Sequence, residues 1–402
     1  MTVLSVAKSI ASVSEHLSQP QLHPIRKLLA FRKTYRRHDQ LISIHESATL
    51  AEALGIMARA NISAVPVYRT PEDDIHGREY MGIVSVSDVL AWTVFQKFVG
   101  DLEYLDTVDP QTFQELQEEK AHYFQTAVGD LLGMTLESAE SWTLHSSDPI
   151  LSLIYMFASG RYHRCLVIDE DAKISAATYG DGTARVPLGA AVTMVTQTDV
   201  VRYISENRVE IDGEAIDKIL SSVVAKDIEQ LQRRMTPDES DPNQVLDKQN
   251  RVPRKVIYAS SDMSALSAFK TMFMHRLRAL PVVNPAHQIV ANISTSDLRG
   301  ITPDTLHRLT LPILEFIDTI PARSSGDAAT HPGSGSGSGS GLDARAVSVA
   351  KNMSMEDMIQ MLLGKNVHRL WVTRDQSDQL AGVVSMTDIL CTLIPVDQAA
   401  HK

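Results

Sequence analysis

Four stretches of the chain share one pattern of apolar and polar positions. In each of them, apolar residues recur at i, i+3, i+4 and i+7, which is the spacing that places side chains on one face of an α-helix. These stretches begin at Leu50, Ile150, Ala265 and Met355. Each is therefore expected to form a helix whose single apolar face lies on a β-sheet.

Two short β-rich runs follow each predicted helix, separated by a turn of variable length. The first runs are 64–68, 165–168, 279–283 and 370–373, and the second are 81–86, 191–197, 289–295 and 381–386. The repeating unit therefore reads strand–helix–strand–strand–helix. A unit of this size buries too little apolar surface to be stable alone, so the units are expected to pair.

The second run of each unit ends in the same polar signature: a hydroxyl residue, a spacer, another hydroxyl residue and an aspartate. The copies are Ser85-Val86-Ser87-Asp88, Thr196-Gln197-Thr198-Asp199, Ser294-Thr295-Ser296-Asp297 and Ser385-Met386-Thr387-Asp388. Such an aspartate can cap the helix that follows it. Its carboxylate can also accept strong hydrogen bonds from two ribose hydroxyls, and the two roles are compatible. The predicted ribose-binding residues are Asp88, Asp199, Asp297, Asp388, Thr198, Ser296, Thr387, Ser385 and Thr196.

Basic residues gather where the first β-rich run of each unit begins. Alignment of the units places Ser63, Arg164, Arg278 and Arg369 at equivalent positions. Arginine presents a planar fork that fits phosphate oxygens, and histidine adds a further donor. The alternative is that these side chains are solvated or pair with carboxylates. The predicted phosphate-binding residues are His163, Arg164, His275, Arg276, Arg278, His368 and Arg369.

The composition disfavours several classes of protein. A net charge of −11 disfavours broad binding to nucleic acid, although a few converging arginines suffice for a small anion. No apolar run approaches the roughly 20 residues that cross a bilayer, so no membrane association is expected. Cys165 and Cys391 are too few for a disulfide framework or a four-cysteine zinc site, and they favour a reducing compartment, the cytoplasm or nucleus.

Signatures of catalysis are missing from the sequence as well. The chain has no glycine-rich loop followed by Lys-Ser/Thr, no protein-kinase motif set and no His/Cys cluster with zinc spacing. The repeats are therefore expected to bind ligands without reacting with them, and neither an enzymatic activity nor a metal is predicted.

A unit of this order that ends in Ser/Thr-x-Ser/Thr-Asp resembles the CBS domain. Four units in a row resemble the gamma regulatory subunit of AMP-activated protein kinase and its plant and fungal relatives. The most specific matches are HRLRALPVV at 275–283, VHRL at 367–370 and RYHR at 161–164. Trp371 and the segment 62–67 are more similar to the plant and fungal branches than to the animal one.

The resemblance implies an α/β fold of α+β repeats in which two tandem CBS pairs, or Bateman modules, form a disc. It also implies regulatory binding of AMP, ADP or ATP in the clefts, with no required metal. The implied partners are the catalytic and scaffold subunits of a protein kinase of the AMP-activated or sucrose-non-fermenting type, and the chain could also form a homodimer.

The segments between the units set the expected domain boundaries. The basic arm at 1–39 predicts a flexible segment followed by a helix at 24–35, with a transit peptide as the alternative. The first CBS pair is expected at 40–206, with units at about 40–95 and 141–206 and a helical insert around 111–132. A connecting helix at 216–234 and a polar linker fill 207–254. The second pair is expected at 255–396, with units at about 255–302 and 345–396 and a Gly/Ser linker, natural or introduced, at 328–341.

Three functional hypotheses remain open at this point. The first is an energy-sensing gamma-type subunit that regulates a kinase through nucleotide occupancy. The second is a stand-alone CBS-repeat regulator or scaffold, for example of a phosphatase, with weak or different adenosyl-ligand binding. The third is a module for S-adenosylmethionine, which needs the ribose aspartate but no phosphate-binding arginines. The presence of Arg164, Arg278 and Arg369 argues against the third.

Overall fold

A computed structural model gives the fold of most of the chain. It describes residues 3–35, 41–71, 76–98, 105–106, 108–134, 138, 143–169, 177–178, 184–187, 190–228, 256–320, 346–374 and 379–395. The predicted Gly/Ser linker at 328–341 lies outside the described residues, and so does the polar linker from residue 229 to residue 254.

The predicted strand–helix–strand–strand–helix order is confirmed in the first two repeats. Repeat one consists of β1 (Ile44–His45), α3 (Leu50–Arg59), β2 (Ala64–Arg69), β3 (His76–Ser85) and α4 (Val86–Leu90), which continues as a π-helix, η1 (Ala91–Phe98). Repeat two consists of β4 (Thr143–His145), α6 (Ile150–Ala158), β5 (Arg164–Asp169), β8 (Ala191–Thr196) and α7 (Gln197–Glu206). In both repeats the first strand is parallel to the second, and the second is antiparallel to the third.

The last two repeats have the same strand pairing but differ in their final helix. Repeat three consists of β9 (Ala259–Ser260), α10 (Ala265–Met274), β10 (Ala279–Val283), β11 (Ile289–Ser294) and a 3-10 turn, η5 (Thr295–Leu298). Repeat four consists of β12 (Ser348–Ala350), α12 (Met355–Gly364), β13 (Arg369–Thr373), β14 (Leu380–Ser385) and α13 (Met386–Cys391). The final helix expected in repeat three stays short because the chain becomes extended at Arg299, with φ −60° and ψ 135°, and Gly300 follows with φ +81°. The 3-10 helix η6 (Pro303–Thr310) and α11 (Ile313–Thr319) follow.

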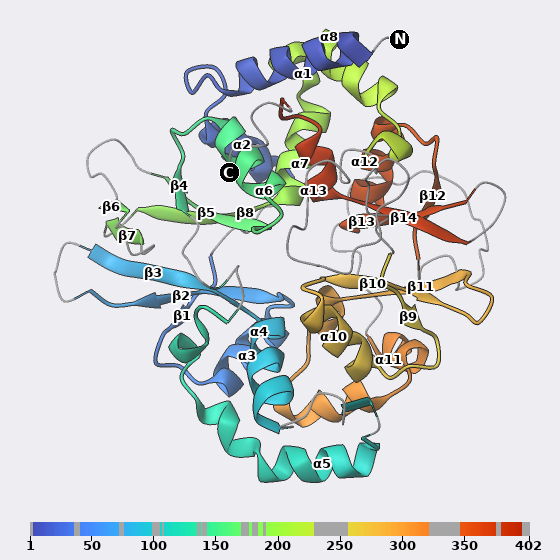
Figure 1. The fold of residues 1–402 in the computed structure, drawn as a ribbon. Coiled ribbons are helices and arrows are strands. Elements are labelled where there is room, and N and C mark those ends of the chain that lie inside the picture. Colours follow the sequence, from blue (N-terminus) through green and yellow to red (C-terminus); the bar gives the residue numbers. More distant parts are fainter. Residues whose placement is uncertain are drawn as a thin grey trace, which may run out of the picture.

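The four repeats form a closed ring, with their sheets toward the middle and their helices outward (Figure 1). The sheets of repeats one and two meet through a cluster of Tyr80, Leu166 and Ile168. Those of repeats three and four meet where the Trp371 Nε1–H donates to Asn292 Oδ1 over 3.1 Å. The expected fold class, two tandem CBS pairs of α+β repeats, is confirmed.

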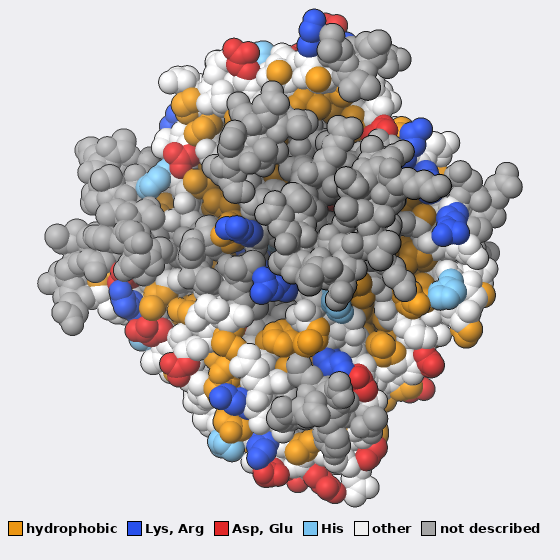
Figure 2. Space-filling view, viewed as in Figure 1, with side chains coloured by type: hydrophobic (Ala, Val, Ile, Leu, Met, Phe, Trp, Pro, Cys, Tyr) orange, Lys and Arg blue, Asp and Glu red, His pale blue; other side chains and the backbone are white. Residues whose placement is uncertain are grey.

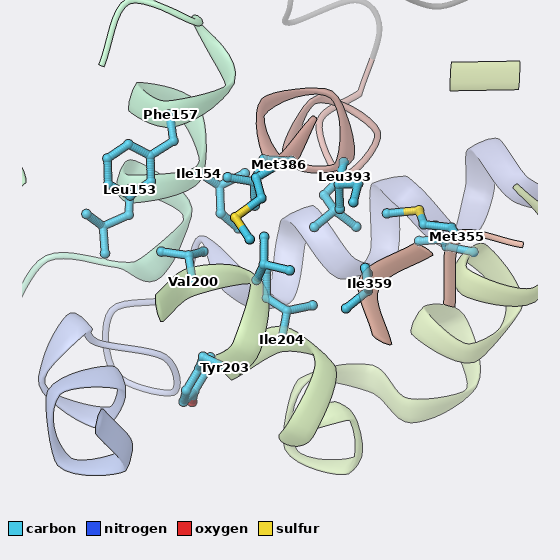
Figure 3. Close-up of a cluster of buried hydrophobic side chains, with 14 of the residues drawn as sticks. Leu153, Ile154, Phe157, Val200, Tyr203, Ile204, Met355, Ile359, Met386 and Leu393 are labelled. Carbon is cyan, nitrogen blue, oxygen red and sulfur yellow. The ribbon is translucent and has the colours of Figure 1, made fainter. Parts of the chain in front are cut away.

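The helices make the remaining contacts between the repeats of the ring. Repeats two and four share one hydrophobic core, and repeats one and three share the other. Figure 3 shows the first core, in which side chains of α6 and α7 meet those of α13 and of the segment that follows it. Its labelled members include Leu153, Ile154, Phe157, Val200, Ile204, Met386 and Leu393. Each repeat therefore contacts one neighbour through its sheet and another through its helices.

Two strands that the sequence analysis did not predict extend the sheet of repeat one. The long strand β3 pairs with β7 (Ala184–Pro187), which in turn pairs with β6 (Ala177–Thr178). The resulting sheet has five strands in the order β1-β2-β3-β7-β6. An insertion within repeat two thus contributes backbone hydrogen bonds to the sheet of repeat one.

The N-terminal segment is helical over more of its length than the sequence predicts. The expected helix at 24–35 is observed as α2 (Ile25–Tyr35), but the arm before it, expected to be flexible, forms a second helix, α1 (Val3–Leu17). Val13 and Leu17 are fully buried in the core of repeats two and four. This burial offsets the entropy cost of ordering the arm.

The two helical segments predicted between repeats have different bounds in the structure. The insert at 111–132 forms α5 (Pro110–Glu119) and two 3-10 turns, η3 (Ala121–Gln125) and η4 (Val128–Leu131). The connecting helix predicted at 216–234 is observed as α8 (Arg208–Ser222), which begins eight residues earlier; residues 225–228 are again helical, and 229–234 lie outside the described residues. The apolar residues Ile211, Ile216 and Ile219 of α8 are buried, so packing against the core determines its extent.

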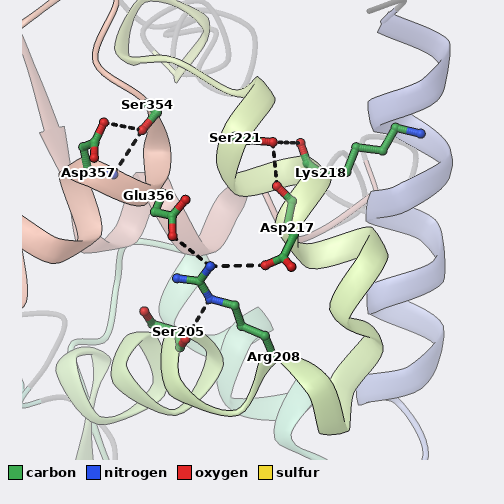
Figure 4. A network of polar contacts seen from close by, with 8 residues as sticks. All are labelled: Ser205, Arg208, Asp217, Lys218, Ser221, Ser354, Glu356 and Asp357. Carbon is green, nitrogen blue, oxygen red and sulfur yellow. Dashed lines mark hydrogen bonds and ion pairs between the residues drawn. The ribbon is translucent and has the colours of Figure 1, made fainter.

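Arg208 ties α8 to repeat four, and its removal should destabilise the fold (Figure 4). Its Nη1 group donates to Glu356 Oε1 over 2.9 Å and to Asp217 Oδ1 over 3.2 Å. Its Nε also donates to the Ser205 carbonyl oxygen over 2.8 Å. We expect Arg208→Ala to lower the free energy of unfolding by about 1 kcal/mol, because three charge-assisted bonds are lost at a half-buried position. Urea unfolding measures this change, with Lys120→Ala, which removes an exposed pair to Glu119, as the control. Equal stability of the two variants would contradict the prediction.

Candidate functional site

The signature aspartate caps the following helix in all four repeats. Its Oδ2 atom accepts a hydrogen bond from the backbone N–H of the first signature residue, over 2.8 Å for Ser85, Thr196 and Ser385 and 2.6 Å for Ser294. The hydroxyl of the same residue donates to the same oxygen. The capping interpretation is therefore confirmed. The cap uses only Oδ2 of each aspartate and leaves Oδ1 for another partner, so ribose binding stays a prediction.

The strand register corrects the alignment of the basic residues. Arg164 pairs with Thr196 and Arg369 with Ser385, both at the first position of their strand. Alanines occupy this position in the other two repeats, where Ala64 pairs with Ser85 and Ala279 pairs with Ser294.

The alignment that made Ser63 and Arg278 equivalent to Arg164 and Arg369 was therefore wrong by one residue. Ser63 and Arg278 instead correspond to His163 and His368. In each repeat the backbone carbonyl oxygen of this residue accepts a hydrogen bond of 2.9–3.3 Å from the backbone N–H of the spacer residue, the second residue of the signature. A shift of one residue along a strand moves a side chain to the opposite face, so the correction changes where Arg278 points.

Arg278 of repeat three and Arg369 of repeat four nevertheless lie close to each other. Burial, followed by the positive charge of Arg278, lowers the pKa of Arg369 to about 10, and the carboxylate of Asp388 opposes this shift. Arg369 is thus within electrostatic reach of two other predicted site residues, Arg278 and Asp388. Arg369 and Asp388 both keep part of their surface exposed. Figure 2 shows some Lys and Arg side chains near the middle of one face and others, together with most of the acidic side chains, toward its rim.

Arg369 has no ion pair to a carboxylate within the part of the chain that the structure describes. A partly buried guanidinium that lies near a second positive charge can be stabilised by an anion. This arrangement suits a phosphate group.

His275 and Arg276 lie on the turn that ends α10, and both side chains are exposed. Arg276 has a φ of +53°, in the left-handed region, as do Asn61 and Asn366 at the same turn in repeats one and four. Asparagine tolerates this conformation better than arginine does, so Arg276 costs roughly 1 kcal/mol of backbone strain. His368 is exposed, and His163 and Arg164 are half-buried.

The second hydroxyls of repeats two and four take part in contacts between the two repeats. Thr387 Oγ1 accepts a hydrogen bond of 2.8 Å from Gln197 Nε2, and the Thr198 hydroxyl donates to Met386 Sδ over 3.4 Å. These two threonines therefore help to join α7 to α13. Ser296 of repeat three is half-buried on η5.

Asp199 of repeat two has an additional pair of partners that the sequence did not indicate. Its Oδ1 atom accepts a hydrogen bond of 2.9 Å from the Tyr35 hydroxyl and lies 3.3 Å from Arg32 Nε. Both residues come from α2. No local pattern could have shown this contact, because 164 residues separate Tyr35 from Asp199.

The described residues contain no group of three or more His, Cys, Asp or Glu side chains arranged to hold a metal ion. No described helix is long and apolar enough to cross a membrane. The thiols of Cys165 and Cys391 are free, and burial raises the pKa of both, that of Cys391 to about 12.

Comparison with known proteins relates the chain to one family. The CBS domain model matches residues 37–94, 252–302 and 343–394, which correspond to repeats one, three and four. The SNF1-related protein kinase regulatory subunit gamma-like PV42a of Arabidopsis thaliana is 26% identical over 379 residues, covering 89% of this chain and 92% of the relative. The SNF1-related protein kinase regulatory subunit gamma-1 of the same plant is 22% identical over 415 residues, covering 94% and 85%.

A solved structure supports the same relationship at the level of the fold. Protein MJ1225 from Methanocaldococcus jannaschii superposes with a TM-score of 0.51 at 13% identity, over 89% of this chain and 98% of that one. Repeat two, which the CBS model does not match, has the same order of elements as the other repeats. The chain is therefore a CBS-repeat protein that resembles the gamma-type regulatory subunits of SNF1-related kinases.

Proposed function

We propose that this chain is a non-catalytic regulatory protein that binds an adenine nucleotide between repeats three and four. The observation that carries the proposal is the approach of Arg278 to Arg369 beside Asp388. In this arrangement the two guanidinium groups hold the phosphates and the free oxygen of the aspartate holds the ribose. The site lies in the second of two CBS pairs, for which we retain the boundaries 40–206 and 255–396.

The choice among adenosyl ligands follows from charge. AMP, ADP and ATP bring phosphates to the two arginines, whereas S-adenosylmethionine carries a ribose but no phosphate. A ligand without phosphate would bring no negative charge to Arg369, whose pKa burial and the positive charge of Arg278 lower. The nucleotides are therefore the expected ligands, and the adenine base is inferred from the family resemblance.

The regulatory role is inferred from the two plant relatives, whose names describe regulatory gamma subunits of SNF1-related kinases. We propose that this chain likewise assembles with a kinase catalytic subunit and a scaffold subunit in the cytoplasm or nucleus. Nucleotide occupancy of the cleft then changes the contacts that the chain offers to these partners.

Calorimetric titration of the full chain tests the proposal. AMP, ADP, ATP, adenosine and S-adenosylmethionine are titrated separately. We expect micromolar binding of at least one nucleotide and binding at least about tenfold weaker for adenosine and S-adenosylmethionine, because both lack the phosphate contacts. The absence of nucleotide binding, or tighter binding of S-adenosylmethionine, would refute the proposal and favour a scaffold or a different adenosyl ligand.

A further inference from the structure

We propose that α2 is a built-in competitor for the repeat-two cleft. Through Arg32 and Tyr35 it holds the carboxylate oxygen of Asp199 that would otherwise receive a ribose, so a nucleotide binds there only when α2 moves away. This inference rests on the proposed function, because it assumes that a signature aspartate can hold ribose.

The contacts of Asp199 occupy both of its carboxylate oxygens. Its Oδ2 atom is used by the helix cap, through the N–H and hydroxyl of Thr196 at 2.8 Å each. Its Oδ1 atom accepts from the Tyr35 hydroxyl at 2.9 Å and faces Arg32 Nε at 3.3 Å. One hydrogen bond from Tyr35 and one ion pair from Arg32 thus occupy the oxygen at which a ribose hydroxyl would donate.

Burial makes this contact exclusive. The side chains of Asp199 and Arg32 are only 1% and 3% exposed. A charged pair this deeply buried is costly to separate, because removal of either partner leaves the other charge desolvated and unpaired. A ribose therefore cannot be added to the present arrangement and has to replace the α2 donors.

Contacts with repeat two and α8 hold α2 in this position. The Phe31 ring meets that of Tyr203 edge to face at 5.6 Å between centroids. The guanidinium of Arg202 lies 5.0 Å from the centre of the Tyr35 ring, and Lys27 pairs with Glu210 over 3.6 Å. A ligand must offset the free energy of these contacts to displace α2, so the repeat-two site is expected to be weaker than the site between repeats three and four.

Repeat four provides the contrast. Asp388 makes the same helix cap through Ser385, but its neighbouring charge is Arg369, a residue of the proposed phosphate site. Asp388 also keeps part of its surface exposed. Two copies of one signature are therefore in different states, one accessible to ligand and one closed by the chain itself.

The double variant Arg32→Ala/Tyr35→Phe tests the inference by calorimetric titration of the full chain with AMP and with ATP. We expect it to bind one more nucleotide per chain than the unmodified protein. Addition of Asp199→Asn should remove that extra site and leave the others. Lys33→Ala, which changes an exposed residue of the same helix, serves as the matched control and should bind as the unmodified protein does.

An unchanged stoichiometry in the double variant would overturn the inference while leaving the proposed function intact. A failure of every variant and of the unmodified protein to bind any nucleotide would overturn both. Hydrogen exchange of the unmodified protein gives a second readout if the double variant does not fold. Saturating nucleotide should speed the exchange of the amides of α2 about threefold or more, since competing ligands weaken each other reciprocally. Unchanged protection of α2 at millimolar AMP and ATP would also overturn the inference.

Discussion

Replacement of Arg369 by alanine should weaken nucleotide binding by about 10- to 100-fold, because a charge-assisted contact to phosphate contributes about 1.5–3 kcal/mol. The fold should tolerate the change. Arg369 lies beside the positive charge of Arg278, and burial already lowers the pKa of Arg369 to about 10. Loss of this guanidinium removes a repulsion as well as a desolvated charge, so the midpoint of thermal unfolding should not fall.

Titration of four proteins with the tightest-binding nucleotide measures this effect. They are the unmodified chain, Arg369→Ala, Arg278→Ala and the double variant. If both arginines contact the same phosphate, the effects of the single changes will not add in the double variant. Arg374→Ala, an exposed change in the same repeat, is the control. Normal affinity in Arg369→Ala would show that the site between repeats three and four is misassigned.

Replacement of Phe157 by alanine should lower the free energy of unfolding by about 3–5 kcal/mol, the usual cost of removing a fully buried aromatic side chain. Phe157 is fully buried on α6, in the core that repeats two and four share. Its carbonyl oxygen also accepts a hydrogen bond of 3.2 Å from Gln197 Nε2, the group that donates to Thr387. The cavity that the missing ring leaves in this shared core should therefore destabilise repeat four as well as repeat two.

Urea unfolding measures the loss of stability, and hydrogen exchange of α13 measures its spread to repeat four. The control is Met274→Ala, at a side chain that is 58% exposed, which should change stability by less than about 0.5 kcal/mol. Faster exchange in α6 with unchanged exchange in α13 would contradict the description of one core common to both repeats.

Local patterns in the sequence were sufficient to predict the repeating unit. The helices α3, α6, α10 and α12 begin at Leu50, Ile150, Ala265 and Met355, the first residues of the four apolar patterns. The helix caps were predictable for the same reason, since a hydroxyl residue and an aspartate three positions later are enough to form them. Hydrophobic periodicity and capping are properties of a few consecutive residues, so they can be inferred without tertiary structure.

The features that the sequence did not reveal depend on segments far apart in the chain. The equivalence of Arg278 with His368 depends on strand register, which a match of residue types cannot determine. The pairing of β3 with β7 joins strands of two different repeats. The contact of Tyr35 with Asp199 spans 164 residues and forms because the arm packs on α7.

The helix cap of the signature aspartate also has an evolutionary consequence. One oxygen of Asp199 serves the fold while the other is held by α2. Selection for a stable helix start is therefore enough to preserve this aspartate, whether or not its repeat still takes up a ligand. A protein can lose ligand binding in one cleft without any substitution in the signature, when another segment of its chain docks against the signature aspartate. The number of signature aspartates in such a protein will then exceed the number of ligands that the protein binds.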